Sequence, residues 1–342
     1  MPRKLASIRR IAEIAPIADA DAIEAVRVDG WWVVARKNEF QVDDLVCYFE
    51  IDSWIPTGLA PFLTKPGKEP REYEGERGER LRTVRLRGQL SQGLIIPLSN
   101  IMSTSEGDDL TELLGIRKYD PPVPAQLAGQ IKGVFPSFIK KTDQERIQNL
   151  PEWPEKHRDV LWEVSVKLDG SSMTVYYNNG DSGVCSRNLD LKEDESNTFW
   201  KVTKRYRIIE ALSSLRCNIA IQGELIGEGI QGNHEKIKGQ DFFVFDIWDI
   251  DQQRHCTVRE RLEFLGKLET RGCKLQEVPV LHDSIPAFRV WQDMTAILHA
   301  AGEGGSYNVP LREGLVFKAT QPINGEVLSF KAINNAFLLA EK

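Results

Sequence analysis

A proline-rich break divides this sequence of 342 residues into two differently patterned parts. The segment KYDPPVPAQLAGQIKG, residues 118–133, contains three prolines and two glycines and has no clear hydrophobic period, which is typical of a linker. A chain of this length also exceeds what one hydrophobic core usually serves. We therefore expect two domains, residues 1–118 and 134–342, joined by a linker at residues 119–133.

The part before the break has the pattern of short strands joined by turns. Gly and Asp separate four apolar segments: AIEAVRVDGWWVVAR, LVCYFEI, RLRTVRLRGQ and GLIIPL. Short strands with such turns favour a small β-barrel. The tryptophan pair Trp31 and Trp32 either fills the core of this barrel or offers a stacking surface.

The part after the break alternates strand patterns with helical patterns. The predicted strands are IAIQGELIG, DFFVFDIWDI, EGLVFKA and EVLSFKAI, and the predicted helices are NTFWKVTKRYRIIEALSSL, VRERLEFLGKLE and PAFRVWQDMTAILHAAG. The fold class of this part is α+β, with a largely antiparallel sheet.

Composition narrows the class of protein without naming a function. A hydrophobic share of 41% and a net charge of −6 are those of an ordinary globular chain, and they argue against indiscriminate binding of nucleic acid. No apolar run approaches a membrane span, and the N-terminus lacks the apolar core of a signal peptide, so we expect a cytoplasmic or nuclear protein. The five cysteines are scattered without a CxxC, which predicts reduced thiols and no zinc site.

The segment GEGIQG, residues 227–232, matches the glycine fingerprint of dinucleotide-binding folds. That fingerprint needs a helix directly after it, within a βαβ unit. Here NHEKIKGQD and then another strand follow. We therefore interpret these glycines as a loop between neighbouring strands.

A single lysine interrupts the apolar stretch VSVKLDGSSMTVYY, residues 164–177. We expect a strand, a turn at Asp169 and Gly170, and a second strand, with Lys167 on the face opposite Val166 and Leu168. Lys167 is either a solvated residue or a nucleophile.

As a nucleophile toward an α-phosphate, the lysine needs cations or a metal that lower its pKa. Asp169 projects to the same side, and charged residues also interrupt apolar strands at Glu224, Glu313, Lys318 and Lys331. Carboxylates of this kind can hold magnesium, and the two lysines can reach phosphate oxygens.

These residues resemble the ordered motifs of the covalent nucleotidyltransferases, the superfamily of ATP-dependent RNA and DNA ligases and mRNA-capping guanylyltransferases. KLDG resembles the K-x-D-G nucleophile motif of that superfamily. The segments that follow in the family's order are CSRN with Arg187, GELIGEGIQGN with Glu224, FFVFDI with Phe245, EGLVFK with Glu313 and Lys318, and SFKAIN with Lys331. The resemblance covers the chain from FPSFIKKTDQERIQN onward.

Two features are more similar to RNA ligases than to the other branches. GELIGEGIQGN followed by DFFVFDI resembles phage-type RNA ligases, and VDGWWVVARKNEFQVDDLVCYFEIDSWIP resembles the OB-type module ahead of the ligase domain in one branch. DNA ligases and capping enzymes carry that module after the last motif, where only residues 332–342 follow here. The resemblance implies an α+β fold with an N-terminal OB-type β-barrel and a nucleotidyltransferase (ATP-grasp-like ligase) domain with mainly antiparallel sheets.

The resemblance also implies a reaction. Lys167 would attack ATP to form lysyl-AMP, AMP would pass to an RNA 5′-phosphate, and a 3′-hydroxyl would displace it, sealing nicks or breaks in RNA. The implied cofactors are ATP and Mg²⁺ or Mn²⁺. A DNA ligase, a capping-type guanylyltransferase and a non-catalytic RNA-binding protein with a relic ligase fold remain the alternatives, although the intact Lys167, Asp169, Glu224 and Glu313 speak against the last.

The resemblance assigns a role to each motif residue. The implied catalytic residues are Lys167, Lys318 and Lys331. Implied nucleotide contacts come from the same lysines and from Arg187, Glu224, Phe245 and Glu313, and the implied metal ligands are Asp169 and Glu313. Phe243 shares a strand face with Phe245 and is the second candidate for stacking on adenine.

One departure from the family concerns its last motif, which usually has two lysines separated by one residue. Ser329 and Ile333 flank Lys331 at those positions. Either Lys318 supplies the missing charge or the step that uses it is weaker.

The predicted barrel carries a candidate RNA surface in RLRTVRLR, residues 80–87. As one strand, this segment would place Thr83, Arg85 and Arg87 on one face. Arg82, Arg85 and Arg87 are therefore candidate contacts for RNA ends, which we expect to belong to a nicked duplex bound by a monomer. The alternative is an edge strand protected by charge.

Overall fold

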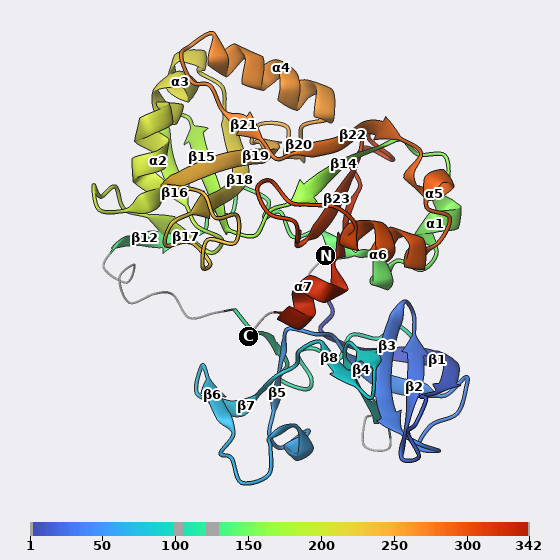
Figure 1. Cartoon of the computed structure of the whole chain (residues 1–342). Coiled ribbons are helices and arrows are strands. Elements are labelled where there is room, and N and C mark those ends of the chain that lie inside the picture. The colour runs from blue at the N-terminus through green and yellow to red at the C-terminus, as the bar shows by residue number, and fades with distance from the viewer. Residues whose placement is uncertain (1–2, 99–104, 121–129, 341–342) are drawn as a thin grey trace. The chain divides into compact units, whose positions relative to one another are not determined.

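The computed structural model describes residues 3–98, 105–120 and 130–340 (Figure 1). The chain forms two compact units, residues 1–122 with Gln148–Pro151, and residues 123–147 with 152–342. Residues 121–129 of the expected linker lie outside the described residues. At its far end, Ile131–Gly133 already belong to a strand.

The first unit is built on a five-stranded sheet that curls, with the strand order β10-β4-β1-β2-β3. Its two outer strands, β3 and β10, lie against each other. β1 is bulged between Ile11 and Glu13, and it pairs with β4 before the bulge and mainly with β2 after it, because a bulge bends its strand. The strands are β1 (Ala6–Pro16), β2 (Ile23–Val28), β3 (Trp31–Arg36), β4 (Leu45–Phe49) and β10 (Leu94–Pro97).

Two smaller sheets and a 3-10 turn complete the first unit. One sheet has the order β11-β5-β7-β6, and the other is the hairpin β8–β9. The elements are β5 (Ser53–Pro56), η1 (Pro61–Leu63), β6 (Arg71–Tyr73), β7 (Glu76–Arg80), β8 (Val84–Leu86), β9 (Gln89–Ser91) and β11 (Arg117–Lys118).

Trp31 is a core residue of the first unit, and Trp32 is half-buried. The Trp31 indole donates a hydrogen bond of 2.6 Å to the side-chain oxygen of Asn149, whose amide donates to buried Glu50 at 2.6 Å. Asn149 lies in Gln148–Pro151, so this short segment from a later part of the sequence completes the polar bonding of the unit.

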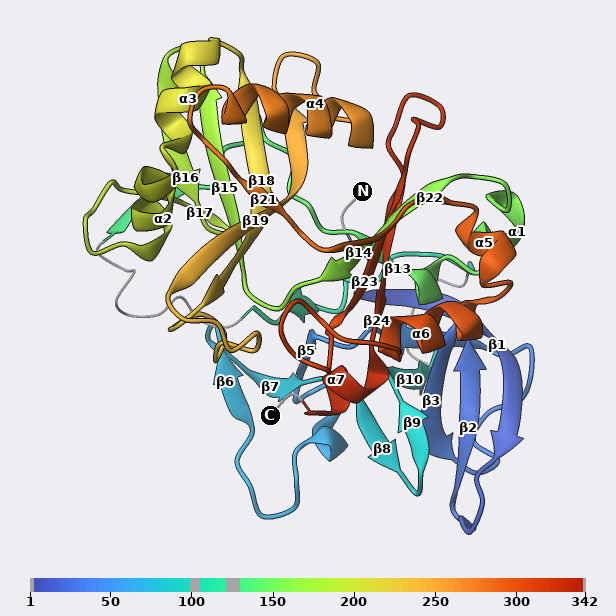
Figure 2. The ribbon, with the colours of Figure 1, turned by 45° about the horizontal axis from the view of Figure 1, so that its top comes forward.

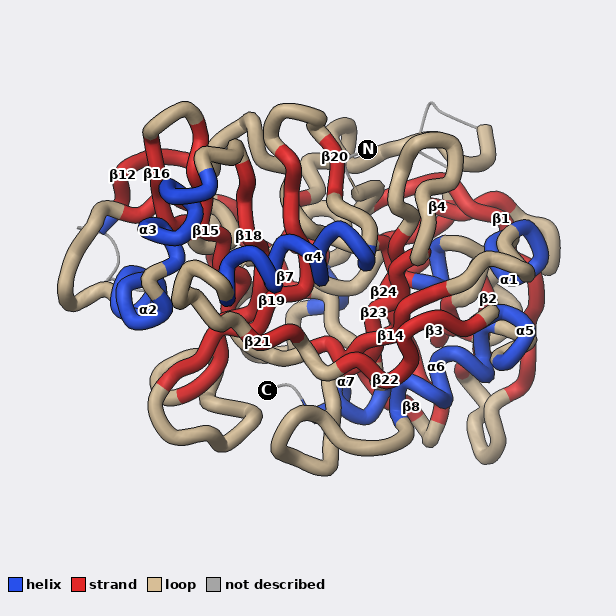
Figure 3. Tube along the Cα trace, turned by 90° about the horizontal axis from the view of Figure 1, so that it is seen from above, coloured by secondary structure: helices blue, strands red, loops and turns tan. Residues whose placement is uncertain are grey.

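The second unit contains a large sheet with the strand order β12-β17-β16-β15-β18-β19-β20, and β21 pairs with β19 in parallel. Three helices, α2, α3 and α4, lie along it (Figure 3). The elements are β12 (Ile131–Val134), β15 (Ser171–Asn178), β16 (Asp181–Cys185), β17 (Leu189–Leu191), α2 (Thr198–Tyr206), α3 (Ile208–Leu215), β18 (Ile219–Gly227), β19 (Gln240–Asp249), β20 (Arg254–His255), α4 (Val258–Glu269) and β21 (Gln276–Glu277).

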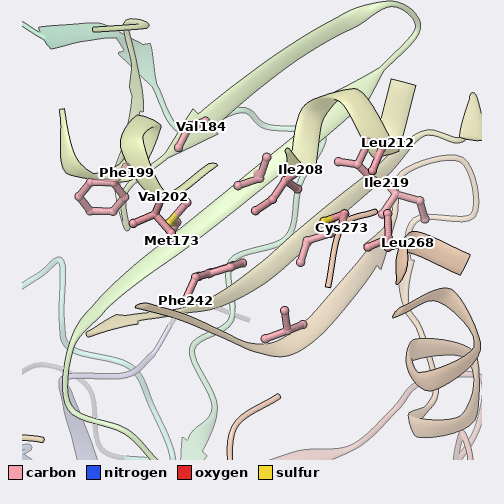
Figure 4. Close-up of a cluster of buried hydrophobic side chains, with 14 of the residues drawn as sticks. Met173, Val184, Phe199, Val202, Ile208, Leu212, Ile219, Phe242, Leu268 and Cys273 are labelled. Atoms are coloured by element: carbon pink, nitrogen blue, oxygen red, sulfur yellow. The ribbon is translucent and has the colours of Figure 1, made fainter. Parts of the chain in front are cut away.

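The helical pattern at residues 197–215 forms two helices instead of the predicted one. Arg207 has a φ of +55° and separates α2 from α3. The break lets apolar residues of both helices reach one core, where Phe199 and Val202 of α2 and Ile208 and Leu212 of α3 pack with Met173 and Phe242 of the sheet (Figure 4).

A second sheet of five strands completes the unit, with the order β13-β24-β23-β14-β22. The helical pattern at residues 286–302 is also divided, into α5 and α6, and Asp293 caps the second helix. The elements are β13 (Glu145–Arg146), α1 (Trp153–Lys156), β14 (Trp162–Lys167), β22 (Val280–Ile285), α5 (Ala287–Val290), α6 (Met294–Gly302), β23 (Gly314–Ala319), β24 (Ser329–Ile333) and α7 (Asn335–Ala340). The 3-10 helix η3 (Ile147–Asn149) begins in this unit, and its last two residues belong to the first unit.

GEGIQG is a loop, as predicted. β18 ends at Gly227, and the next strand, β19, returns antiparallel beside it. A βαβ unit is therefore absent at this place, and the fingerprint does not mark a dinucleotide site.

Candidate active site

The predicted hairpin around Asp169 and Gly170 is wrong, because its two strands belong to different sheets. β14 pairs with β22 and β23, whereas β15 pairs with β16 and β18. Figure 2 shows the chain running from β14 of the smaller sheet into β15 of the larger one. Lys167 is the last residue of β14, so it lies where the chain passes between the sheets.

Gly170 is needed at this passage because of close packing and not because of a positive φ. Its φ is not in the left-handed region. A Cβ at this position would lie 2.4 Å from the carbonyl oxygen of Leu225 and 2.7 Å from Ile226. The absent side chain therefore lets the passage approach β18 closely.

Three predicted lysines lie on one face of the five-stranded sheet. Lys167 pairs with Gly314, Val316 pairs with Lys331, and Lys318 pairs with Ser329. Directly opposed residues of antiparallel strands share a face, and so do residues two apart in one strand. The opposite face carries the aromatic core, including Trp162, Phe317 and Phe330.

Lys167 forms an ion pair with Glu313, with 2.7 Å between the ammonium nitrogen and the carboxylate. Burial alone would lower the pKa of Lys167, but Glu313, Glu224 and Asp169 together raise it above its usual value. We expected cations or a metal around this lysine, with carboxylates to hold the metal, and the described side chains that act on it are these carboxylates. These three carboxylates therefore keep Lys167 protonated.

Glu224 is strongly affected by the same surroundings. Burial, together with the negative charges of Glu313 and Asp169, raises the pKa of Glu224 to about 8, and Lys167 and Arg187 oppose that shift. A carboxylic acid that stays protonated near neutral pH can donate a hydrogen bond.

The main chain fixes Glu313 next to Lys167. The amide of Asn334 donates to the Glu313 carbonyl at 2.8 Å, and the Asn334 side chain donates to the Arg312 carbonyl at 3.0 Å. A Cβ at Gly314 would lie 2.3 Å from the Ala332 carbonyl oxygen. Close packing of β23 against β24 therefore depends on this glycine.

Lys318 is buried, and its ammonium lies 3.1 Å from Asp246 and donates to the Phe245 carbonyl at 2.6 Å. Burial alone would raise the pKa of Asp246, but Lys318 and His255 hold it well below its usual value. Ser329, one of the two positions where the family can have a further lysine, lies directly opposite Lys318. The Lys318 side chain is thus on the expected face. Its charge is neutralised by Asp246, which the sequence patterns did not indicate as a partner.

Lys331 and Arg187 meet at a second unexpected carboxylate, that of Asp143. The Lys331 ammonium lies 3.0 Å from Asp143, and the Arg187 guanidinium lies 3.5 Å from it. Asp143 comes from the segment before β13, and its only sequence signal was its place within FPSFIKKTDQERIQN. The structure therefore brings together two cations that were predicted as nucleotide contacts.

The two candidate rings differ in exposure. Phe243 is 1% exposed, whereas Phe245 is half-buried. The pairing of β18 with β19 is irregular between Gln222 and Gly223, so that Phe245 is skipped in the register. A bulge of this kind re-aims nearby groups, and here the Phe245 carbonyl accepts from Lys318.

The carboxylates of the site fit a magnesium or manganese ion that is also bound by water and by substrate phosphates. In the described parts of the chain, no group of three or more His, Cys, Asp or Glu residues is arranged to hold a metal. Magnesium commonly binds through one or two carboxylates together with water and substrate phosphates. Asp169 and Glu313, which both act on Lys167, match that requirement.

Comparison with known proteins decides the family. A sequence model described as RNA ligase matches residues 160–333, and one described as an OB-fold domain matches residues 5–98. The chain belongs to the RNA ligase family.

Solved structures agree with this assignment along nearly the whole ligase chain. A Naegleria gruberi RNA ligase mutant in its apo form has a TM-score of 0.90 and 48% identity, covering 98% of this chain and 97% of that one. A further mutant with AMP and Mn has the same TM-score and identity, with 98% of each chain covered. The N. gruberi RNA ligase with PPi has a TM-score of 0.89 and 49% identity, again with 98% coverage of each chain. Among curated proteins, no relative matches the sequence.

The candidate RNA surface of this RNA ligase differs from the predicted strand. Only Val84–Leu86 form β8, and Arg87 and Gly88, with φ values of +48° and +82°, form the turn to β9. Arg82 lies before the strand and is half-buried. Arg85 donates to the Gly88 carbonyl at 2.7 Å. Of Thr83, Arg85 and Arg87, which were expected on one strand face, Arg85 alone lies in the strand.

Two further observations bear on the ligase as a whole. All five cysteines are free thiols, as predicted. In residues 3–98, 105–120 and 130–340, no helix has the length and hydrophobicity needed to cross a membrane.

Proposed function

We propose that this RNA ligase joins a 3′-hydroxyl to a 5′-phosphate by using ATP, with Lys167 as the nucleophile. The observation that carries the proposal is the position of Lys167, at the end of β14 and 2.7 Å from Glu313. Its amine would form a bond to the α-phosphorus of ATP, and the bond to the pyrophosphate oxygen would break. AMP would then pass to the RNA 5′-phosphate, and the 3′-hydroxyl would displace it.

The solved relatives support these roles. Structures of the N. gruberi RNA ligase hold ATP and Mn or AMP and Mn. Its substituted lysine and aspartate are two positions apart, like Lys167 and Asp169. A substituted glutamate follows that lysine at the same separation as Glu224 follows Lys167.

Each remaining side chain has a proposed task. Phe245 stacks on adenine, since it is the more accessible of the two rings. Glu224 hydrogen-bonds to the ribose. Lys331 and Arg187 bind the phosphates or the RNA terminus in exchange for Asp143, and Lys318 adds positive charge on the same face.

Asp169 and Glu313 would hold the divalent cation. When bound, it would neutralise the carboxylates that raise the pKa of Lys167 and offset charge on the phosphate oxygens. The amine can then lose its proton and act as a nucleophile.

The substrate that we propose is a nick in duplex RNA, bound by a monomer. A cytoplasmic or nuclear location agrees with the five free thiols. Arg82, Arg85 and Arg87 stay as proposed RNA contacts, through the exposed β8–β9 turn and the residues beside it.

Labelling tests the nucleotide and the nucleophile together. The protein is incubated with magnesium and α-labelled ATP or GTP, beside a Lys167→Ala variant and a sample treated with EDTA. We expect label from ATP alone to survive denaturation, and both the variant and the chelated sample to lose it. Label from GTP would instead indicate a guanylyltransferase. Failure of a folded protein, free of bound AMP, to take up either label would refute the catalytic proposal.

Sealing assays then test the substrate. Matched nicked duplexes are made with RNA or DNA on each side of the nick. We expect sealing to require RNA on the 3′-hydroxyl side. Equal sealing of an all-DNA nick would favour a DNA ligase.

A further inference from the structure

An exposed aromatic side chain packs on a ring of the apolar cluster that contains Val166 and Leu168, and it has no role in the reaction described above. Tyr307 is 46% exposed, and its ring meets Phe243 at 4.8 Å between centroids, with 62° between the ring planes. Among the described residues of the second unit, it is the most exposed aromatic side chain. An exposed ring held against another ring suits contact with a planar ligand.

The ring that Tyr307 contacts belongs to an apolar cluster that includes the two residues next to Lys167 in the sequence. Phe243 packs with Val166 and Leu168, the residues on either side of Lys167. Phe245 packs against the same cluster and is half-buried. Tyr307 and Phe245 therefore both lie against the cluster that contains Phe243.

A buried carboxylate fixes the loop that carries Tyr307. Glu235 is 1% exposed. Its carboxylate accepts hydrogen bonds from the Ser306 hydroxyl and, at 2.8 Å, from the Asn308 amide. The Asn308 side chain donates to the Glu235 carbonyl at 3.0 Å. These bonds hold the residues before and after Tyr307. The loop that carries the ring is therefore fixed by hydrogen bonds to a buried carboxylate.

A second link joins the same two loops. His234 and the carbonyl of Leu311 form a hydrogen bond of 2.7 Å, two residues before Glu313. The loop that begins with GEGIQG thus supports the loop that leads into the active-site strand β23. Both contacts come from His234 and Glu235, which follow the GEGIQG segment directly after Asn233.

We propose that Tyr307 is a binding residue for the nucleotide base, and that Glu235 is its positioning residue. The proposal rests on the proposed placement of the nucleotide on Phe245 beside Lys167. The Tyr307 ring offers apolar contact to the base, and its hydroxyl can exchange a hydrogen bond with the base edge. Neither residue takes part in bond making, so both act on binding of ATP.

The test measures the initial rate of lysine labelling against ATP concentration in Tyr307→Ala, Tyr307→Phe and Glu235→Gln. We expect Tyr307→Ala to raise KM for ATP by roughly 5- to 150-fold, the range of one aromatic contact to a base, and to leave kcat within about twofold. Tyr307→Phe keeps the ring and should lose less. Glu235→Gln should raise KM in the same direction, and thermal unfolding of each variant checks that it is folded.

Competition separates base binding from distortion of the site. In Tyr307→Ala, the inhibition constant of AMP should rise by a factor similar to KM, whereas that of inorganic pyrophosphate should not change. Equal rises for both inhibitors, or a KM within about twofold of wild type, would overturn the proposal. Phe62→Ala, which removes an exposed ring of the first unit, is the matched control and should change neither constant.

Phe245→Ala separates this inference from the proposed function. If Phe245→Ala raises KM and Tyr307→Ala does not, the inference on Tyr307 fails while the ligase site stands. If wild type takes up no label at all, the proposed function fails first.

Discussion

Replacing Lys318 with methionine should separate its contribution to folding from its contribution to catalysis. Lys318 and Asp246 are both nearly buried, with exposed side-chain fractions of 6% and 5%. Lys318→Met would leave Asp246 as a buried charge without its lysine, which costs about 3–5 kcal/mol. The Phe245 carbonyl would also lose its donor.

Neutralising the partner should recover most of that loss. Lys318→Met combined with Asp246→Asn removes both charges, and replacing a whole buried pair is often nearly neutral. The three proteins are compared by urea unfolding, followed by tryptophan fluorescence. We expect a free energy of unfolding that falls in Lys318→Met and returns to within about 2 kcal/mol of wild type in the double variant.

The pH dependence of stability has a definite sign. Because the pKa of Asp246 is depressed in the folded protein, the pair stabilises the protein above the ordinary pKa of an aspartate. That stabilisation is lost as the pH falls through the lower folded-state pKa. The difference between wild type and Lys318→Met should therefore shrink below about pH 4.

Activity decides what the lysine does beyond packing. If Lys318 adds charge on the face of Lys167 and Lys331, the stable double variant should still label at least about 100-fold more slowly than wild type, as loss of one charge-stabilising group does elsewhere. Recovery of labelling along with stability would refute the catalytic role and leave Lys318 as a structural residue. A cost below about 1 kcal/mol for Lys318→Met would refute the energetic reasoning.

Three further substitutions test the site and its support. Gly170→Ala should destabilise the protein by about 1–3 kcal/mol, since a Cβ would meet Leu225, whereas Gly266→Ala, in open space on α4, should be neutral or stabilising by up to about 1 kcal/mol. Urea unfolding of both checks this, and equal effects would contradict it. Glu313→Gln removes a carboxylate that raises the pKa of Lys167, so Lys167 should react with an amine-specific reagent at lower pH than in wild type, as peptide mapping can show. An unchanged pH profile would contradict the assigned cause. Asn149→Ala should cost about 1–3 kcal/mol, because the buried Trp31 indole and Glu50 lose a partner, and unchanged unfolding would show that the segment contributes little.

Local sequence patterns predicted the strands and helices in which apolar residues recur with the period of one type of secondary structure. IAIQGELIG coincides with β18, and VRERLEFLGKLE coincides with α4. The helix is well marked because Thr257 and Glu260 form a capping box at its start. Such signals act within a few residues, so they are visible in the sequence.

Pairing between distant strands was not visible in the same way. KLDG followed by an apolar run has the pattern of a hairpin, and only the partners of β14 and β15 show that the chain changes sheets there. The charges of Lys318 and Lys331 were predicted as free for phosphates. Their carboxylate partners, Asp246 and Asp143, come from distant segments, and no local spacing connects them.

The motif residues were predictable because each interrupts an apolar strand. Lys167, Glu224 and Glu313 did meet in one place. Tyr307 was missed because an aromatic residue in a loop of Gly, Ser and Asn has no periodic signal. Glu235 was missed because a charged residue in a loop usually faces water.

The excursion of Gln148–Pro151 into the first unit has a consequence for how this enzyme could be divided or recombined. Cutting the chain once in the proline-rich segment would not yield two complete pieces, because the N-terminal piece would lack Asn149, the acceptor for the Trp31 indole. The C-terminal piece would carry Asn149 without Trp31 and Glu50, the two residues to which its side chain is hydrogen-bonded. Exchange of the N-terminal module between ligases would therefore succeed only when this short stretch is exchanged with it.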